Sequence, residues 1–351
     1  MRDAASHAPV PAALGEALAR VAAGADARDR GAPEFPEEPI RLLERAGALA
    51  PARGRDDWDL VRRAARADAS VGRILDGHLN GVERLMLLAE PRLHAAEAAA
   101  LAAGARRIGV WGADPAPGEG PPARLSRGPR GASVDGVKVW CSGAGGVDRA
   151  LVTVRGEAAA PLLAYVDVTR GTEVDRAWFR GSGLRTSESH RVVFRAAPVV
   201  AVLGEPGELA RDPWFSLDAM RTAASWVGMG EAAAEAALDA LAARGEADDL
   251  AGHAAGRIAV AVGIMEACLS SAAGAARRRD DDLRAASVRL RAAVDGACRE
   301  ILDAARVAGS GALVRGGALD RCRRDLELFL LQHRLDPMVA ATGRDAIARR
   351  R

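Results

Sequence analysis

Several residue types are scarce in this sequence of 351 residues. Of its 49 basic residues only Lys138 is a lysine, and aromatic residues make up 3% of the chain. Proteins that bind nucleic acid usually interleave basic clusters with aromatic side chains, which stack on the bases. The formal net charge is +2 and no such cluster occurs, so we expect no nucleic-acid partner.

Cysteine is also sparse and irregularly spaced. The chain has four cysteines, at positions 141, 268, 298 and 322, with no CxxC pair and no Cys/His pattern of metal-ligand spacing. The spacing of the cysteines therefore indicates neither a zinc site nor a disulfide framework. We expect no bound metal.

Long uncharged apolar runs are missing as well. No stretch of about 18 apolar residues lacks a charge, so the sequence predicts no transmembrane helix and no membrane partner. The first residues include Asp3 and have no long apolar core, which argues against a secretory signal. With 49% hydrophobic and 27% charged residues, the composition is typical of a folded protein of the cytoplasm.

The length predicts two or three domains, and the pattern along the chain divides into three blocks. Residues 1–105 read as a helical N-terminal domain, with apolar side chains at helical spacing from Val71 to Leu85. Residues 106–205 contain short β-branched runs separated by Gly, Pro or Asp, which predicts an antiparallel β-domain. Residues 206–351 return to alanine-rich helices, the last at about 319–334, which predicts a helical bundle and a homodimer or homotetramer.

Three motifs in this order carry a resemblance to a known superfamily. They are GVKVWCSG at 136–143, GLRTSES at 183–189 followed by LGE at 203–205, and RVAGSGALVRGGALDRCRRD at 306–325. Together they are similar to motifs of the acyl-CoA dehydrogenase superfamily of flavoproteins, over nearly the full chain. The resemblance implies an α+β fold with a helical N-terminal domain, a central antiparallel β-domain that faces the flavin, and a C-terminal four-helix bundle.

The resemblance also implies a flavin site, for FAD or FMN. Trp111 and Trp140 would lie against the flavin, and the Ser142 hydroxyl would hydrogen-bond its N5 atom. Gly309 and Gly311 would let the backbone approach the flavin phosphate, with Arg306 close by. The bundle would therefore contribute both phosphate contacts and the oligomer interface.

Two departures concern the base that removes a proton from an acyl thioester in the dehydrogenases. The two positions where the superfamily carries this glutamate are occupied here by His333 and Met220. The sequence is closer at these sites to the two-component flavin monooxygenases, the branch of dibenzothiophene monooxygenase. Members of that branch resemble this chain in having a histidine at the position of His333, a serine at that of Ser142 and, in several cases, a histidine at that of His78.

The leading hypothesis is therefore a monooxygenase that takes reduced flavin from a separate reductase and acts on a small organic substrate. His333, His78 and Ser142 are its expected catalytic residues. One alternative is an acyl-CoA dehydrogenase with an atypical base. The other is a non-catalytic paralogue that acts as an oligomeric partner.

Overall fold

Helices form the N-terminal part of the computed structural model, which describes residues 11–51, 56–129, 131–245, 248–278, 282–314, 316–331 and 335–350. They are α1 (Ala12–Ala23), α2 (Ala25–Arg30), α3 (Glu37–Arg45), α4 (Asp57–Ala67), α5 (Ala69–Leu88) and α6 (Pro91–Ala102). Asp56 Oδ1 accepts the Asp59 N–H at 3.1 Å, and Asp68 Oδ1 accepts the Val71 N–H at 3.1 Å. These caps satisfy amide groups that the first turns of α4 and α5 leave unbonded.

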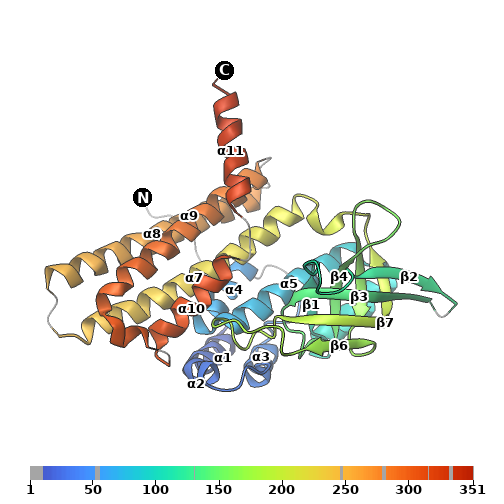
Figure 1. Cartoon of the computed structure of the whole chain (residues 1–351), viewed down its shortest axis with the longest axis horizontal. Coiled ribbons are helices and arrows are strands. Elements are labelled where there is room, and N and C mark those ends of the chain that lie inside the picture. Colours follow the sequence, from blue (N-terminus) through green and yellow to red (C-terminus); the bar gives the residue numbers. More distant parts are fainter. Residues whose placement is uncertain are drawn as a thin grey trace.

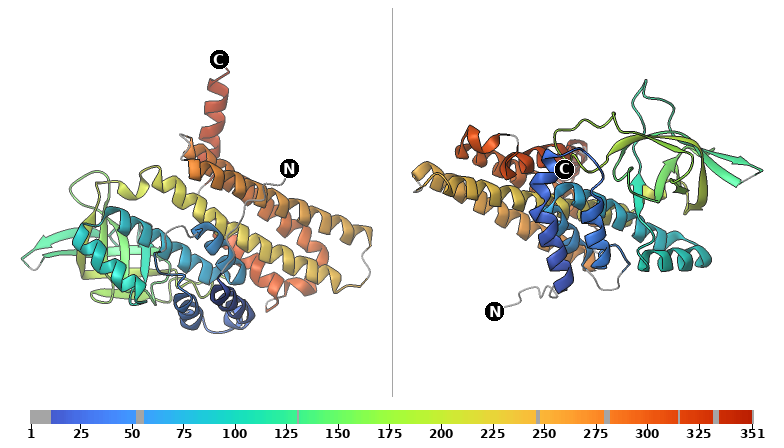
Figure 2. Two further views of the ribbon diagram at one scale, coloured as in Figure 1. Left: turned by 180° about the vertical axis from the view of Figure 1, so that it is seen from behind. Right: turned by 90° about the horizontal axis from the view of Figure 1, so that it is seen from below.

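α5 is the helix on which the rest of the molecule is assembled. It contacts α4 on one side, α7 (Trp214–Ala242) on another, and β1 (Ile108–Trp111) of the sheet domain. Figures 1 and 2 show α5 and α7 running side by side from the bundle toward the sheet. Several polar side chains on these two helices, among them Asp76, Arg84 and Asp218, are consequently buried.

The middle of the chain forms one sheet of seven strands. They are β1, β2 (Arg124–Gly128), β3 (Gly131–Cys141), β4 (Arg149–Val154), β5 (Leu162–Asp167), β6 (Thr172–Asp175) and β7 (His190–Leu203). The order is β1-β4-β5-β7-β3-β2, with β6 also paired to β7. β7 is long enough to pair with β5 at its C-terminal end and with β3 and β6 at its N-terminal end. It therefore joins the two halves of the sheet.

One strand pair differs from the antiparallel sheet that the sequence predicted. β1 pairs with β4 in parallel, from Ile108 opposite Arg149 to Trp111 opposite Val152. The chain between them passes through the β2–β3 hairpin, so it returns to the start of the sheet in the same direction. Such a crossover leaves no local turn signal in the sequence.

The C-terminal part is the predicted bundle. α7 packs with α8 (Asp249–Arg278), α9 (Leu283–Ala304) and α10 (Ala318–Leu330), with the short 3₁₀ turns η2 (Ala305–Ala308) and η3 (Ser310–Leu313) between the last two. A further short turn, η1 (Glu208–Ala210), precedes α7. α7 approaches α4 so closely that a Cβ on Gly228 would lie 1.9 Å from the Arg62 carbonyl oxygen. The chain also has a helix that the sequence did not predict, α11 (Asp336–Ala348), which projects from the bundle in Figure 1.

α8 is long and apolar enough to cross a membrane by length and composition alone. Its most apolar 18-residue window has a mean hydropathy of 1.7, and 33% of that window is buried. Core helices of water-soluble proteins meet the same criteria. Here one side of α8 packs on α9 and α7. Elsewhere on the same helix, Val260 is 64% exposed and Ile264 is 45% exposed.

We expect the exposed apolar side of α8 to contact a second copy of the chain in a dimer or tetramer. In a symmetric contact both subunits contribute the same residues, so the double substitution Val260→Glu/Ile264→Glu would bury negative charges from both subunits against each other. It should therefore dissociate the oligomer and lower the molar mass measured by light scattering. Val200→Glu, on the exposed part of β7, is the matched control and should leave the mass unchanged. A monomeric mass of the unmodified protein at micromolar concentration would contradict the prediction.

Candidate functional site

The end of β3 combines an exposed aromatic side chain with a serine. The register with β7 shifts between Lys138 and Cys141, and Trp140 adopts a φ of 56° at this irregularity. The Trp140 side chain is 52% exposed, while Cys141 is fully buried. Ser142 lies in the turn that follows, fixed by the Gly143 N–H, which donates to the Ser187 carbonyl at 2.8 Å. The bulge therefore leaves the Trp140 indole exposed next to the turn that contains Ser142.

Ser142 Oγ is held by two neighbours. Arg73 Nε donates to it at 3.2 Å, and Ser189 Oγ lies 2.9 Å away, within hydrogen-bond distance. Ser187 Oγ continues this chain of hydroxyls at 2.8 Å from Ser189 Oγ. Because the guanidinium has no acceptor atom, the Ser142 hydroxyl hydrogen points to Ser189 or to a ligand.

Arg73 is the residue at this site that the sequence reasoning missed. It projects from α5, donates to Asp76 Oδ2 at 2.9 Å, and holds its guanidinium carbon 5.6 Å from the centroid of the Phe329 ring. Burial lowers the pKa of Arg73, and the nearby Asp76 opposes that shift. Its one sequence signal is a pair of opposite charges three residues apart in the first half of α5, which has no other charged residue.

Asp76 connects Arg73 to further buried charges between α5 and α7. Its Oδ2 accepts a hydrogen bond from Thr222 at 2.9 Å, and Arg221 lies 3.6 Å from its Oδ1. The cations of this ionic cluster are Arg73, Arg84 and Arg221, and its anions are Asp76, Glu83 and Asp218. The formal charges balance, so removal of one member would leave an uncompensated charge inside the protein.

Asp218 is a member of the ionic cluster with a raised pKa. Burial raises its pKa to about 6, although Arg221 and Arg84 both favour the ionised form. Arg221 bonds it at 2.9 Å, and Arg84 donates to its second oxygen. The interior behind Ser142, which Arg73 and Asp76 connect to Asp218, therefore contains several buried charges.

Aromatic rings surround Trp140 on its exposed side. The centroids of Trp178 and Phe179 lie 4.9 Å and 6.0 Å from that of Trp140, both in edge-to-face geometry. Trp178 Nε1 donates to Glu119 Oε1 at 2.9 Å, which ties the group to the loop before β2. Edge-to-face contacts of this kind fix ring orientation.

Strained backbone is concentrated near these rings. Trp140, Leu184 and Glu188 have φ values of 56°, 50° and 48°, in the left-handed region that non-glycine residues rarely adopt. Leu184 donates its N–H to Asp325 Oδ1 at 2.6 Å, which anchors the segment to α10. Strain that is held in place by surrounding contacts is common at functional sites.

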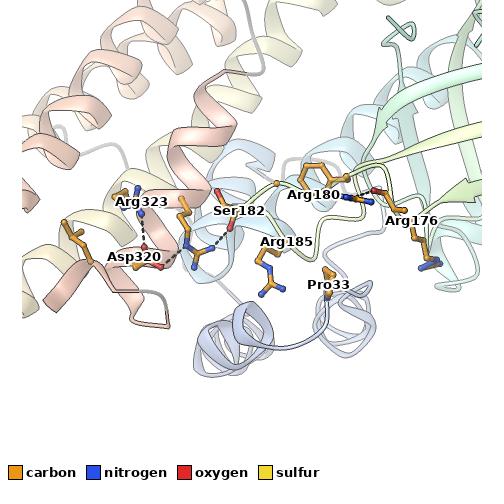
Figure 3. Close-up of a pocket in the computed structure, with 12 residues that line it drawn as sticks. Pro33, Arg176, Arg180, Ser182, Arg185, Asp320 and Arg323 are labelled. Atoms are coloured by element: carbon orange, nitrogen blue, oxygen red, sulfur yellow. Dashed lines mark hydrogen bonds and ion pairs between the residues drawn. The ribbon is translucent and has the colours of Figure 1, made fainter. Parts of the chain in front are cut away.

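A cavity of about 660 Å³ lies next to the aromatic group (Figure 3). It is formed by the segment after β6, the start of α10 and the loop between α2 and α3. We refer to it as the arginine cavity, and its lining residues are Pro33, Arg176, Ala177, Phe179, Arg180, Gly181, Ser182, Arg185, Leu313, Asp320, Arg323 and Arg324. Phe179 is shared between the cavity and the group around Trp140.

His78 lies away from the end of β3. Its side chain is buried, with Nε2 2.8 Å from the Leu49 carbonyl oxygen and Nδ1 accepting the Ile108 N–H at 3.1 Å. Both ring nitrogens are therefore used to join the N-terminal helices to β1. This geometry favours a structural role for His78.

The other expected site residues are spread out. Trp111 is 1% exposed within the sheet core, and its Nε1 donates to the Ser142 carbonyl at 3.1 Å, so it supports the turn from beneath. The Arg306 side chain is 76% exposed and pairs with Asp303 at 3.5 Å. Gly309 has a φ of 89°. Among the described residues, no atom would lie within 4 Å of a Cβ at Gly309 or Gly311, so the space beside both glycines is open. His333 lies outside the described residues.

Position 220, where part of the superfamily carries its base, holds no carboxylate, and the described residues provide no metal site. Met220 is fully buried in the bundle core, in one hydrophobic cluster with Leu184 and Trp226. Among the described residues no group of three His, Cys, Asp or Glu side chains could hold a metal ion. The side chain that contacts Ser142 from α5 is instead a cation.

No family model matches the sequence, and no curated protein matches it. Solved structures match over nearly the whole chain. The methanesulfinate monooxygenase MsuC from Pseudomonas fluorescens has a TM-score of 0.81 at 18% identity, covering 98% of this chain and 97% of its own. The dibenzothiophene monooxygenase TdsC from Paenibacillus sp. A11-2, solved with FMN and indole, has a TM-score of 0.79 at 19% identity, covering 95% of both chains.

Butyryl-CoA dehydrogenase from Megasphaera elsdenii has a TM-score of 0.81 at 14% identity, covering 97% of this chain and all of its own. These matches establish the fold. The predicted acyl-CoA dehydrogenase-like architecture, α+β with helices on both sides of the sheet in sequence order, is confirmed.

Proposed function

We propose that this chain is a flavin-dependent oxidoreductase that uses FAD or FMN at the end of β3. The residues present fit the ring of a flavin, since Trp140 is 52% exposed and the Ser142 hydroxyl can donate its hydrogen to a ligand in place of Ser189. A bound flavin would supply the redox chemistry. The residues of the chain would hold the ring, donate a hydrogen bond from Ser142 and exclude water.

Within this class we propose a monooxygenase that receives reduced flavin from a separate reductase and oxidises a small organic substrate. The observation that carries this choice is the contact between Arg73 and Ser142. A guanidinium is a poor proton acceptor, and position 220 is a buried methionine. Desaturation of an acyl thioester needs a base near the flavin, and the two positions where the superfamily carries that glutamate hold Met220 and His333 here.

We propose that His333 gives or takes a proton, because an unperturbed imidazole has a pKa of about 6.5 and is therefore present in its neutral and protonated forms near neutral pH. We further propose that Gly309, Gly311 and Arg306 contact the flavin phosphate. His78 has no role in the proposed reaction. We also propose that the protein works in the cytoplasm as a homo-oligomer, with no metal and no nucleic-acid partner.

Flavin content tests the proposal. Purified protein is titrated with FMN and FAD, oxidised and reduced, under anaerobic conditions, and oxygen uptake is then followed with candidate substrates. Tight binding of reduced flavin with oxygen uptake supports the oxygenase. A stoichiometric yellow FAD and turnover of saturated acyl-CoAs with an artificial electron acceptor support the acyl-CoA dehydrogenase, the alternative that the butyryl-CoA dehydrogenase fold raises. Absence of flavin binding in both redox states supports a non-catalytic oligomeric partner.

Substitution of Ser142 by alanine should weaken the binding of reduced FMN about tenfold, because one hydrogen bond to the flavin is worth about 1 kcal/mol or slightly more. The dissociation constant is measured by anaerobic fluorescence titration. Ser126→Ala, on the exposed strand β2, is the control and should leave it unchanged. Equal constants for Ser142→Ala and the unmodified protein would remove Ser142 from the site.

A further inference from the structure

The arginine cavity combines a large positive charge with an apolar wall. Five of its lining residues are arginines, and Asp320 is the one carboxylate among the described residues that line it. The apolar part is made by Phe179, Leu313 and Pro33. A volume of about 660 Å³ falls in the range of sites for small organic ligands.

Three of these arginines are paired with carboxylates. Arg323 and Arg324 both bond Asp320, at 2.9 Å and 2.8 Å, and Arg324 also pairs with Asp29 at 2.6 Å. Arg176 pairs with the buried Glu188 at 3.0 Å. Their charge is largely compensated within the protein.

Arg180 and Arg185 are different. In the part of the chain that the structure describes, both donate only to backbone carbonyl oxygens: Arg180 Nε to Ala177 at 2.9 Å, and Arg185 to Gly31 at 3.2 Å and to Asp29. Carbonyl oxygens fix a guanidinium in place without neutralising its charge. The cavity thus holds two oriented cations that have no carboxylate partner.

We propose that the arginine cavity binds the phosphate group of a phosphorylated organic molecule. A phosphate monoester carries up to two negative charges and three acceptor oxygens, which match two guanidinium groups that each offer parallel N–H donors. Its organic part lies on Phe179 and Leu313. Two sources share this chemistry, a phosphorylated substrate and the phosphate of FMN, because Phe179 also contacts Trp140. Only the second source rests on the proposed function.

Phenyl phosphate is the probe, because it has an aromatic ring and one phosphate but no redox chemistry. Calorimetric titration should show binding to the unmodified protein that weakens with rising salt. In Arg180→Gln/Arg185→Gln the dissociation constant should rise about tenfold or more, since two charge-assisted hydrogen-bonding groups are lost. Arg124→Gln/Arg127→Gln on β2 removes the same charge elsewhere and should bind as the unmodified protein does.

Arg185 also contacts the backbone of the N-terminal domain, so the single variants Arg180→Gln and Arg185→Lys accompany the double variant. Arg180→Gln should weaken phenyl phosphate, and Arg185→Lys should weaken it less than the double variant does. Failure of the unmodified protein to bind phenyl phosphate at millimolar concentration overturns the proposal. Equal weakening by the control pair on β2 overturns it as well.

Titration with oxidised FMN and riboflavin identifies the source of the phosphate. If FMN binds more tightly than riboflavin and the Arg180→Gln/Arg185→Gln variant removes that difference, the cavity holds the flavin phosphate, and the assignment of that phosphate to Gly309, Gly311 and Arg306 is wrong. If that variant weakens phenyl phosphate alone, the cavity serves a phosphorylated substrate. Because phenyl phosphate needs no flavin, a protein that binds it but no flavin would contradict the proposed function and leave this inference standing.

Discussion

Asp325→Asn should make the protein more stable at pH 8, by on the order of 2–4 kcal/mol, and should flatten its stability between pH 4 and pH 7. Burial raises the pKa of Asp325 to about 7, against the opposing hydrogen bond from the Leu184 N–H. Below about pH 4 the carboxyl is protonated in both the folded and the unfolded states. Between pH 4 and pH 7 the carboxyl ionises readily in the unfolded state but stays protonated in the folded state, so the contribution of Asp325 to stability is lost as the pH rises through this range. Asparagine keeps the acceptor for Leu184 and carries no charge.

The free energy of unfolding, from urea titrations at pH 5 and pH 8, measures this effect. Asp295→Asn, whose carboxylate pairs with Arg299 at 2.9 Å on the surface of α9, is the control for loss of an acidic group. A variant at position 325 that is less stable than the unmodified protein at pH 8 would show that the ionised carboxylate is the favoured form.

Arg73→Met should lower the free energy of unfolding by about 3–5 kcal/mol, because it removes the nearest cation from the buried carboxylate of Asp76. Methionine fills a similar volume, so the loss reports charge more than packing. The double variant Arg73→Met/Asp76→Met removes both charges and should be more stable than the single variant. Arg221 keeps its bonds to Asp218 and Glu83 in both.

Urea unfolding of the three proteins measures this difference, and Ser142 gives a second readout. Since Arg73 orients the serine hydroxyl, reduced FMN should bind the double variant more weakly than the unmodified protein even where stability recovers. If the single and double variants unfold at the same urea concentration, the ion pair of Arg73 and Asp76 does not account for the loss.

The order of the fold was accessible from sequence because its patterns are local. Helical spacing from Val71 to Leu85 and the β-branched runs after 106 each report on one element. The parallel pairing of β1 with β4 and the bulge at Trp140 depend on neighbours that are distant in sequence, so no local pattern indicates them. The division into three domains at 105 and 205 stays a prediction.

The site was only partly accessible for the same reason. The GVKVWCSG motif directed attention to Trp140, which the structure leaves exposed at the end of β3, and to Ser142 in the turn that follows. Helical periodicity identifies the apolar side of α5 but does not reveal that Arg73 lies inside the protein with Asp76. The arginine cavity is built from segments near 33, 180 and 323, and only the tertiary fold brings them together.

The scarcity of lysine has a practical consequence once the position of Lys138 is known. Its ammonium lies inside the sheet, 2.8 Å from Asp114 Oδ1 and 2.7 Å from Thr153 Oγ1, and the residue is 1% exposed. Amine-directed reagents therefore find no accessible lysine on the folded chain, so cross-linkers of that type cannot capture its oligomers through lysine. Because of the same burial, Lys138 can react only when β3 separates from its neighbours. The rate of Lys138 acylation therefore reports how often the sheet opens.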